Sequence, residues 1–189
     1  MREEAEWLIR MVENLLSVTR IDGGRLQIAK TPTVLEELID SVLIKFRKRY
    51  PGQAVTVEIP DEFLTVPMDA VLIEQVLINL LENAVQHAVG MRQLWLRVAC
   101  RGGQAIFEVE DDGCGIPRDK LGELFNGRMD GADGHKFMGS GLSVCATIIK
   151  AHGGGITAEN RREGGALFRF WLALEDGPAP AAAGKEGSH

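Results

Sequence analysis

The most regular pattern of apolar and polar positions lies in residues 69–88. At 3.6 residues per turn this stretch predicts a helix that Asp69 caps, with an apolar face for the core. The apolar face comprises Ile73, Leu77, Leu80, Leu81, Ala84 and Ala88, and the opposite face comprises Gln75, Asn79, Glu82, Asn83 and Gln86. Asn is a poor helix former, so Asn79 and Asn83 in mid-helix indicate a site for a cation or phosphate. An ordinary solvated surface is the open alternative.

Helical periodicity recurs in three other stretches. Residues 33–49 predict a helix in which Thr33 and Glu36 have the spacing of a capping box. Residues 120–125 predict a single helical turn, and residues 141–151 predict a helix that ends at a run of glycines.

Residues 1–22 predict a helix with the apolar spacing of a helical bundle, ended by Gly23 and Gly24. A lone helix cannot bury such a face, so we expect it to pair with another helix or to fold back on its own domain. Residues 176–189 are rich in Pro, Ala and Gly and predict a disordered tail.

Alternating apolar residues predict the strands. Single strands are expected at residues 26–30, 55–59 and 66–68, and hairpins at residues 94–100 with 105–110 and 156–160 with 166–174. This order of elements predicts an α+β domain, with an antiparallel or mixed sheet that carries its helices on one face.

Composition narrows the class of protein. Hydrophobic residues make up 45% of the chain and charged residues 25%, as in a soluble globular domain. The formal net charge of -6 argues against a nucleic-acid-binding protein. No apolar run reaches the roughly 20 residues of a membrane span, and no signal peptide opens the sequence, so we expect a soluble, cytosolic domain.

Several common kinds of site lack their defining residues. The cysteines Cys100, Cys114 and Cys145 form no CxxC pair, so we interpret them as small packing residues, with Cys114 exposed in a loop. The motifs HExxH, GxSxG and GxxxxGK[ST] are absent from the sequence. The usual classes of zinc protease, serine hydrolase and P-loop protein are therefore excluded.

Two glycine-rich segments indicate ligand chemistry. Asp111 opens a DxGxG turn after a predicted strand, where backbone can approach a ligand and the carboxylate can accept from an amino group. A plain turn is the alternative. Residues 139–142 precede a predicted helix, whose free amides and dipole attract phosphate. Together with the amides of Asn79 and Asn83, these segments describe a purine nucleotide with magnesium.

The order of these motifs resembles the catalytic and ATP-binding domain of sensor histidine kinases, in the fold shared with type II topoisomerases, the ninety-kilodalton heat-shock chaperone and mismatch-repair ATPases. The resemblance covers residues 24–175. The N box is similar to residues 79–88, and the first glycine, phenylalanine and second glycine boxes to residues 111–115, 121–125 and 139–142. It implies the Bergerat fold, a two-layer sandwich of a mixed, mostly antiparallel sheet and three helices. DAVLIEQVLINLLENA and AENRREGGALFRF resemble the potassium-responsive Kdp-type sensor kinases.

The resemblance implies ATP and Mg²⁺ as ligands. It implies Asn83 as the magnesium ligand, Asn79 as its neighbour in the phosphate site, and Asp111 as the acceptor from the adenine amino group. The nucleotide-binding residues expected in this way are Asn79, Asn83, Gln86, His87, Asp111, Gly113, Gly115, Ile116, Phe125, Arg128, Gly139, Ser140, Gly141 and Leu142.

The sequence also departs from the family pattern. Gln86 stands where the family usually has Lys, which removes a cationic phosphate contact, while His87 can still stack on the nucleotide. Phe137 with Met138 replaces a leading glycine, and Ala166 replaces a frequent hydroxyl. Arg128 is a candidate for the missing charge, although a solvated lid residue is the alternative.

The resemblance also implies a domain organisation. Residues 1–22 are similar to the end of the second helix of the dimerisation and phosphoacceptor domain, residues 23–30 form a linker and first strand, and residues 31–175 form the catalytic domain. No histidine precedes His87, so we expect no autophosphorylation by this stretch alone. The expected partners are an upstream phosphoacceptor helix, a homodimer partner and a response regulator. The expected setting is the cytoplasmic side of an inner-membrane sensor.

Three functions remain open. The first is a histidine kinase domain that transfers the terminal phosphoryl group of ATP by positioning and charge neutralisation. The second is an ATPase of the chaperone or gyrase class, whose water-activating Glu would stand at Asn79, whereas Glu82 is displaced around the helix. The third is a degenerate nucleotide-binding or interaction module, which Gln86, Phe137 and Ala166 would favour.

Overall fold

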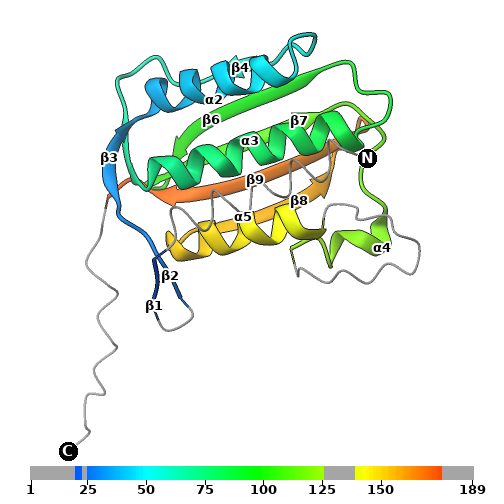
Figure 1. Cartoon of the computed structure of the whole chain (residues 1–189). Coiled ribbons are helices and arrows are strands. Elements are labelled where there is room, and N and C mark those ends of the chain that lie inside the picture. The colour runs from blue at the N-terminus through cyan, green and yellow to red at the C-terminus, as the bar shows by residue number, and fades with distance from the viewer. Residues whose placement is uncertain (1–19, 23–24, 126–138, 176–189) are drawn as a thin grey trace, which may run out of the picture.

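The computed structural model describes residues 20–22, 25–125 and 139–175. A five-stranded sheet in the order β4-β6-β7-β9-β8 forms one layer (Figure 1). Its strands are β4 Thr56–Glu58, β6 Leu94–Arg101, β7 Gln104–Asp111, β8 Gly155–Asn160 and β9 Ala166–Ala173. Strand β4 pairs parallel with β6, and the other pairs are antiparallel. The predicted hairpins and the mixed sheet are therefore confirmed.

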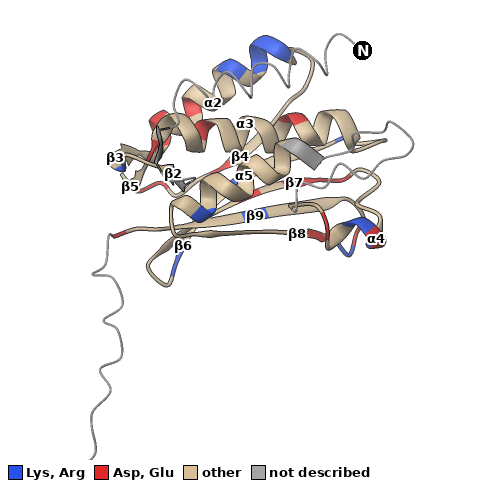
Figure 2. Ribbon diagram, turned by 60° about the horizontal axis from the view of Figure 1, so that its bottom comes forward, with Lys and Arg blue, Asp and Glu red and all other residues tan. Residues whose placement is uncertain are grey.

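The second layer consists of α2 Leu35–Arg49, α3 Ala70–His87 and α5 Gly139–Ala151, on one face of the sheet (Figure 1). Helix α3 lies between the other two and contacts both. Acidic residues begin α2 and basic residues end it (Figure 2), which complements the helix dipole. In the described ranges, no helix is long and apolar enough to cross a membrane.

Alternation along the strands sorts residues between the two faces of the sheet. In β7, Ala105, Phe107 and Val109 point to the helices and are buried. Phe107 stacks on Phe170 of β9 with ring centroids 4.7 Å apart. The same alternation places Asp111, the last residue of β7, on the helix side, where the residue is 3% exposed. The alternation along β7 therefore places the Asp111 carboxylate between the sheet and the helices.

Two short strand pairs lie outside the main sheet. Strand β1 Arg20–Asp22 pairs with β2 Arg25–Gln27, and β3 Thr31–Val34 pairs with β5 Thr65–Met68. The helix predicted over residues 1–22 is therefore wrong at its end, because the hairpin pairing satisfies the backbone there. Residues 1–19 lie outside the described ranges. The strand predicted over residues 26–30 is likewise shorter than expected and begins one residue earlier.

The predicted helix starts need correction. Thr33 lies in β3 and its Oγ1 donates to Thr31 O at 3.1 Å, so it forms no capping box. Helix α2 begins instead at Leu35, whose amide donates to Leu64 O at 2.9 Å. Asp69 occupies the N-cap of α3 without a side-chain cap bond. Its Oδ2 accepts from Ala29 N at 3.4 Å and so contacts the segment between β2 and β3.

The turn predicted over residues 120–125 also moves. Helix α4 spans Arg118–Leu121 and begins directly after Pro117, whose fixed φ suits a helix start. Gly122 is its C-cap, and residues 122–125 form turns. Of the cysteines, Cys145 is buried, while Cys114 and Cys100 are exposed, so the packing role expected for Cys100 is wrong.

His152 connects the start of α3 with the end of α5. It is 3% exposed, its Nε2 accepts from Asp69 N at 3.1 Å, and its Nδ1 lies 2.7 Å from Ile148 O. Since a backbone N–H can only donate and a carbonyl can only accept, the imidazole must be neutral with its proton on Nδ1. Burial lowers the pKa of His152 below its usual 6.5, and the positive charge of Lys30 adds to this effect. The hydrogen bond with Ile148 O and the negative charge of Asp69 act in the opposite direction.

We expect this contact to make stability pH-dependent. The unfolded chain binds the His152 proton more readily, so the contribution is complete above about pH 6.5 and is lost as the pH falls through the lower folded-state pKa. Urea unfolding at pH 8 and pH 5 of the wild type and His152→Gln measures this. Gln can make both hydrogen bonds without titrating, so its stability should fall less. An equal fall in both proteins would contradict the prediction.

Candidate functional site

Three of the five polar residues predicted on one face of α3 are buried, so a solvated surface does not explain them. Asn79, Glu82 and Asn83 are 2%, 1% and 8% exposed. Buried polar side chains require partners, because an unpaired one costs about 1–3 kcal/mol. Asn79 and Glu82 have partners within the protein, whereas the amide nitrogen of Asn83 has none among the described residues.

Asn79 is directed at the start of α5. Its Nδ2 donates to Gly141 O at 2.7 Å and to Cys145 Sγ at 3.0 Å. Burial raises the pKa of the Cys145 thiol to about 12, so the sulfur stays protonated and neutral. Asn79 therefore fixes the second glycine segment against α3 through direct contacts between the helices.

Glu82 and Gln86 are directed at the end of α2. The carboxylate of Glu82 forms an ion pair with Arg49. Gln86 is exposed, and its Nε2 donates to the hydroxyl of Tyr50 at 3.5 Å, a long hydrogen bond. Phe46 and Tyr50 contact each other with ring centroids 5.2 Å apart. Both Glu82 and Gln86 thus interact with residues at the C-terminal end of α2.

Asn83 lines a pocket between α3 and the sheet. Its Nδ2 is buried and has no hydrogen-bond partner among the described residues. A buried N–H donor without a protein partner can donate to a bound group such as a phosphate oxygen. The pocket is lined by Asn83, Ala84, His87, Ala88, Asp111, Gly115, Ile116, Ala166 and Phe168.

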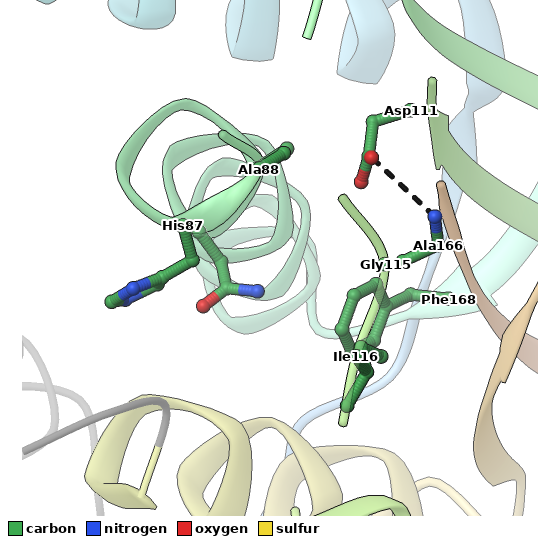
Figure 3. Close-up of a pocket in the computed structure, with 9 residues that line it drawn as sticks. His87, Ala88, Asp111, Gly115, Ile116, Ala166 and Phe168 are labelled. Atoms are coloured by element: carbon green, nitrogen blue, oxygen red, sulfur yellow. Dashed lines mark hydrogen bonds between the residues drawn. The ribbon is translucent and has the colours of Figure 1, made fainter. Parts of the chain in front are cut away.

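Asp111 lies across the pocket from α3 (Figure 3). Its Oδ1 accepts from Gly113 N at 2.9 Å and from Ala166 N at 3.4 Å. Burial raises the pKa of Asp111, and these backbone hydrogen bonds oppose that rise. No hydrogen bond to the second oxygen, Oδ2, is found within the described residues, which leaves it able to accept from a ligand.

The glycine turn after Asp111 fits closely against its surroundings. A Cβ on Gly113 would lie 2.7 Å from the Cβ of Ala88, and Gly115 has a positive φ of 76°. Any larger residue at position 113 would push the turn away from α3. Asp112 accepts from Gln93 N and Arg92 N at 2.8 and 2.7 Å, and these bonds, Gln93 first, lower its pKa.

The structure thus brings together part of the expected residue set. Asn83, His87, Asp111, Gly115 and Ile116 line one pocket. Gly113 lies against it, Asn79 and Gln86 are engaged elsewhere, and Phe125 is partly buried against the core. Gly139, Ser140, Gly141 and Leu142 form the first turn of α5, where Leu142 is buried. Arg128, with Phe137 and Met138, lies outside the described residues.

Some pocket residues were not expected from the sequence. Ala84 and Ala88, one turn apart on α3, leave space beside the sheet, and Phe168 lies opposite. Asn160 and Arg161 reach the glycine turn from the β8–β9 connection. The pairing of Asn160 with Ala166 in the predicted hairpin could have located them, since Ala166 lies beside the end of β7.

The fold and the pocket agree with comparisons to known proteins. Residues 68–176 match the family described as histidine kinase-, DNA gyrase B-, and HSP90-like ATPase, and the chain belongs to this family. The catalytic domain of the histidine kinase ThkA superposes with a TM-score of 0.65 at 29% identity, over 77% of this chain and 96% of that one. The predicted Bergerat-type fold is confirmed, and the fold is that of a histidine kinase catalytic domain.

Among sensor kinases, the chain is similar to Kdp-type proteins. It is 37% identical over 178 residues to the sensor protein KdpD of Clostridium acetobutylicum, which covers 92% of this chain and 20% of that protein. The sensor protein KdpD of Escherichia coli is 35% identical over 173 residues, 89% of this chain and 19% of that protein. The chain thus spans about a fifth of the length of these curated relatives.

A second ThkA structure, in complex with the response regulator protein TrrA, superposes with a TM-score of 0.71 at 28% identity. The match covers 92% of this chain and 49% of that one. It therefore extends beyond the residues that match the isolated catalytic domain.

Proposed function

We propose that this domain binds ATP with Mg²⁺ and transfers the terminal phosphoryl group to a histidine of a phosphoacceptor helix. The observation that carries the proposal is that two polar groups with free hydrogen-bonding capacity lie on opposite sides of one pocket. Asn83 has a buried amide without a protein partner, and Asp111 offers a carboxylate oxygen. An adenine nucleotide has the complementary groups, an amino donor at one end and phosphates at the other.

The base end would lie at the sheet. The adenine amino group would donate to Asp111 Oδ2, because Oδ1 is occupied by two backbone amides. Ala84, Ala88 and Phe168 give this part of the pocket apolar walls for a flat ring. His87, one turn after Asn83 on α3, also lines the pocket and would contact the nucleotide. Figure 3 shows its ring directed away from Asp111.

The phosphate end would lie between α3 and the start of α5. Mg²⁺ keeps several waters and needs few protein ligands, and within the described ranges no group of three His, Cys, Asp or Glu residues could hold a metal. A single carboxamide is consistent with that chemistry: Asn83 would hold the ion through its oxygen Oδ1, while Nδ2, the atom without a protein partner, would donate to a phosphate oxygen. When bound, Mg²⁺ would neutralise phosphate charge. The first amides of α5, placed by Asn79, would bind the phosphates.

Transfer is favoured over hydrolysis by the direction of Glu82. An ATPase of the chaperone or gyrase type needs a carboxylate that can activate water in the site. Glu82 is paired with Arg49 on the far side of α3, and the residue one turn before Asn83 is Asn79, which binds α5. Among the pocket-lining residues the only carboxylate is Asp111, which lies at the proposed base end.

The proposal is tested by mixing this chain with a fragment that carries a sensor kinase phosphoacceptor histidine, with γ-labelled ATP and Mg²⁺. We expect label on the acceptor fragment, on a bond that acid breaks and alkali does not. Omission of the acceptor should leave this chain unlabelled with little phosphate released. Rapid phosphate release without an acceptor would favour the ATPase, and tight ATP binding without transfer or hydrolysis would favour a binding module.

The setting of the domain follows from the same proposal. This domain would be the cytoplasmic kinase unit of an inner-membrane sensor, and the dimerisation helix would end before strand β1, which begins at Arg20. Its partners would be a second copy, the upstream acceptor helix and a response regulator. The relationship to KdpD and the ThkA complex with TrrA support this arrangement.

A further inference from the structure

The β8–β9 connection lies against the glycine turn of the pocket. Asn160, the last residue of β8, makes two hydrogen bonds with the backbone of one residue in that turn. Ile116 N donates to Asn160 Oδ1 at 2.7 Å, and Asn160 Nδ2 donates to Ile116 O at 2.8 Å. The carboxamide thus satisfies both backbone hydrogen-bonding groups of Ile116, as a neighbouring strand would, and fixes the position and orientation of this residue.

The same connection also reaches the other end of the turn. Arg161 Nη1 donates to Asp111 O at 3.1 Å, and Ala166 N donates to Asp111 Oδ1 at 3.4 Å. Arg161 is held in turn by an ion pair with Glu110, and its guanidinium lies 5.0 Å from the ring centroid of Trp95. Both ends of the 111–116 segment are therefore anchored by residues 160–166.

The two segments lie in close contact at two glycines. A Cβ on Gly115 would lie 2.8 Å from Asn160 Oδ1. A Cβ on Gly165, where φ is +101°, would lie 1.9 Å from Asp111 O. Gly165 therefore has no room for a side chain, and the positive φ of Gly115 also favours glycine, so the two segments pack directly against each other.

We propose that Asn160 is a positioning residue for base recognition, and that it sets the preference for adenine through the 111–116 segment. This inference rests on the proposed nucleotide-binding function. Gly113 N, which orients the Asp111 carboxylate, belongs to that segment, and Ile116 lines the pocket. Without Asn160, the segment is released at its Ile116 end, and its glycines allow other conformations. The carboxylate then loses the fixed direction that distinguishes an amino donor from a carbonyl acceptor.

The position of Asn160 makes it a clean target for mutation. Its side chain is at an exposed position, so truncation opens no core cavity. The structure also offers a matched control. Glu159, the preceding residue of β8, points to the opposite side of the strand, and its carboxylate lies 3.7 Å from Arg169 Nη1.

The test compares the affinities of ATP and ITP for the wild type, Asn160→Ala and Glu159→Gln by calorimetry with Mg²⁺. ITP carries a carbonyl acceptor in place of the adenine amino donor. We expect the ATP-to-ITP preference to fall about fivefold in Asn160→Ala, the effect of one hydrogen bond, and to be unchanged in Glu159→Gln. Asn160→Asp keeps the acceptor for Ile116 N but turns a carboxylate oxygen toward Ile116 O in place of the donor, so its ATP-to-ITP preference should also fall.

A uniform loss of affinity for ATP and ITP in Asn160→Ala would show a merely structural role and overturn the inference. An unchanged preference would also overturn it while leaving ATP binding by the wild type, and the proposed function, intact. A wild type that binds neither nucleotide would overturn both. Should Asn160→Ala not fold, the comparison of Asn160→Asp with the wild type decides by the same criteria.

Discussion

Asn83→Ala is expected to weaken magnesium-dependent nucleotide binding about 100-fold or more, as loss of a charge-assisted contact to metal and phosphate does. The fold should be nearly unaffected, because Asn83 Nδ2 has no hydrogen-bond partner among the described residues. Removing a buried amide that bonds nothing in the protein leaves no protein group newly unpaired. Calorimetry with ATP and Mg²⁺ measures the affinity, and urea unfolding without ligand measures the stability.

Asn79→Ala is the matched control, one helical turn away. Its amide donates to Gly141 O and Cys145 Sγ, so truncation should destabilise the ligand-free domain by about 1–3 kcal/mol. The two variants are thus expected to differ in the stability of the ligand-free domain, which Asn79→Ala should lower and Asn83→Ala should leave nearly unchanged. Unchanged affinity in Asn83→Ala would refute the assignment of this residue to the metal site.

Asp111→Asn is expected to weaken ATP binding about 10- to 100-fold, the range of a hydrogen bond to a charged group. The Asn carbonyl oxygen can still accept from Gly113 N and Ala166 N, as Oδ1 does now. The amide nitrogen then occupies the position of Oδ2, and its hydrogens face the amino group of the base. Two donors opposed in a buried position repel each other and leave both unpaired. Calorimetry with ATP gives the loss.

Asp112→Asn removes the same charge from the adjacent residue. Asp112 does not line the pocket, and an amide oxygen can continue to accept from Arg92 N and Gln93 N. We expect its affinity for ATP to remain within about threefold of the wild type, since a change outside the site usually has small effects. A loss as large as that of Asp111→Asn would indicate a general charge effect and would exclude a specific contact at Asp111.

The local pattern of the sequence was sufficient for most of the fold. Period-two alternation located the strands of both hairpins, and the 3.6-residue period located α2, α3 and α5, because these periods follow from backbone geometry. The first residues of the helices were harder to predict from the sequence. Thr33 and Asp69 have the composition of N-caps, yet strand pairing of Thr33 and the contact of Asp69 with Ala29 use their side chains differently. Tertiary partners decide such competitions between local hydrogen bonds.

The candidate site divides in the same way. The sequence by itself determined that α3 carries an unusual row of amides and that Asp111 ends a strand at a glycine turn, since residue type and periodicity suffice for both. Only the tertiary structure decided what each side chain does. Asn79 binds α5, Glu82 binds Arg49, and Asn83 alone of these three lines the pocket. Likewise Asn160 reaches Ile116 from 44 residues away, a contact that depends on how β8, β9 and β7 are ordered in the sheet. Periodicity fixes which face a side chain occupies, whereas its partner is fixed by the packing of elements distant in sequence.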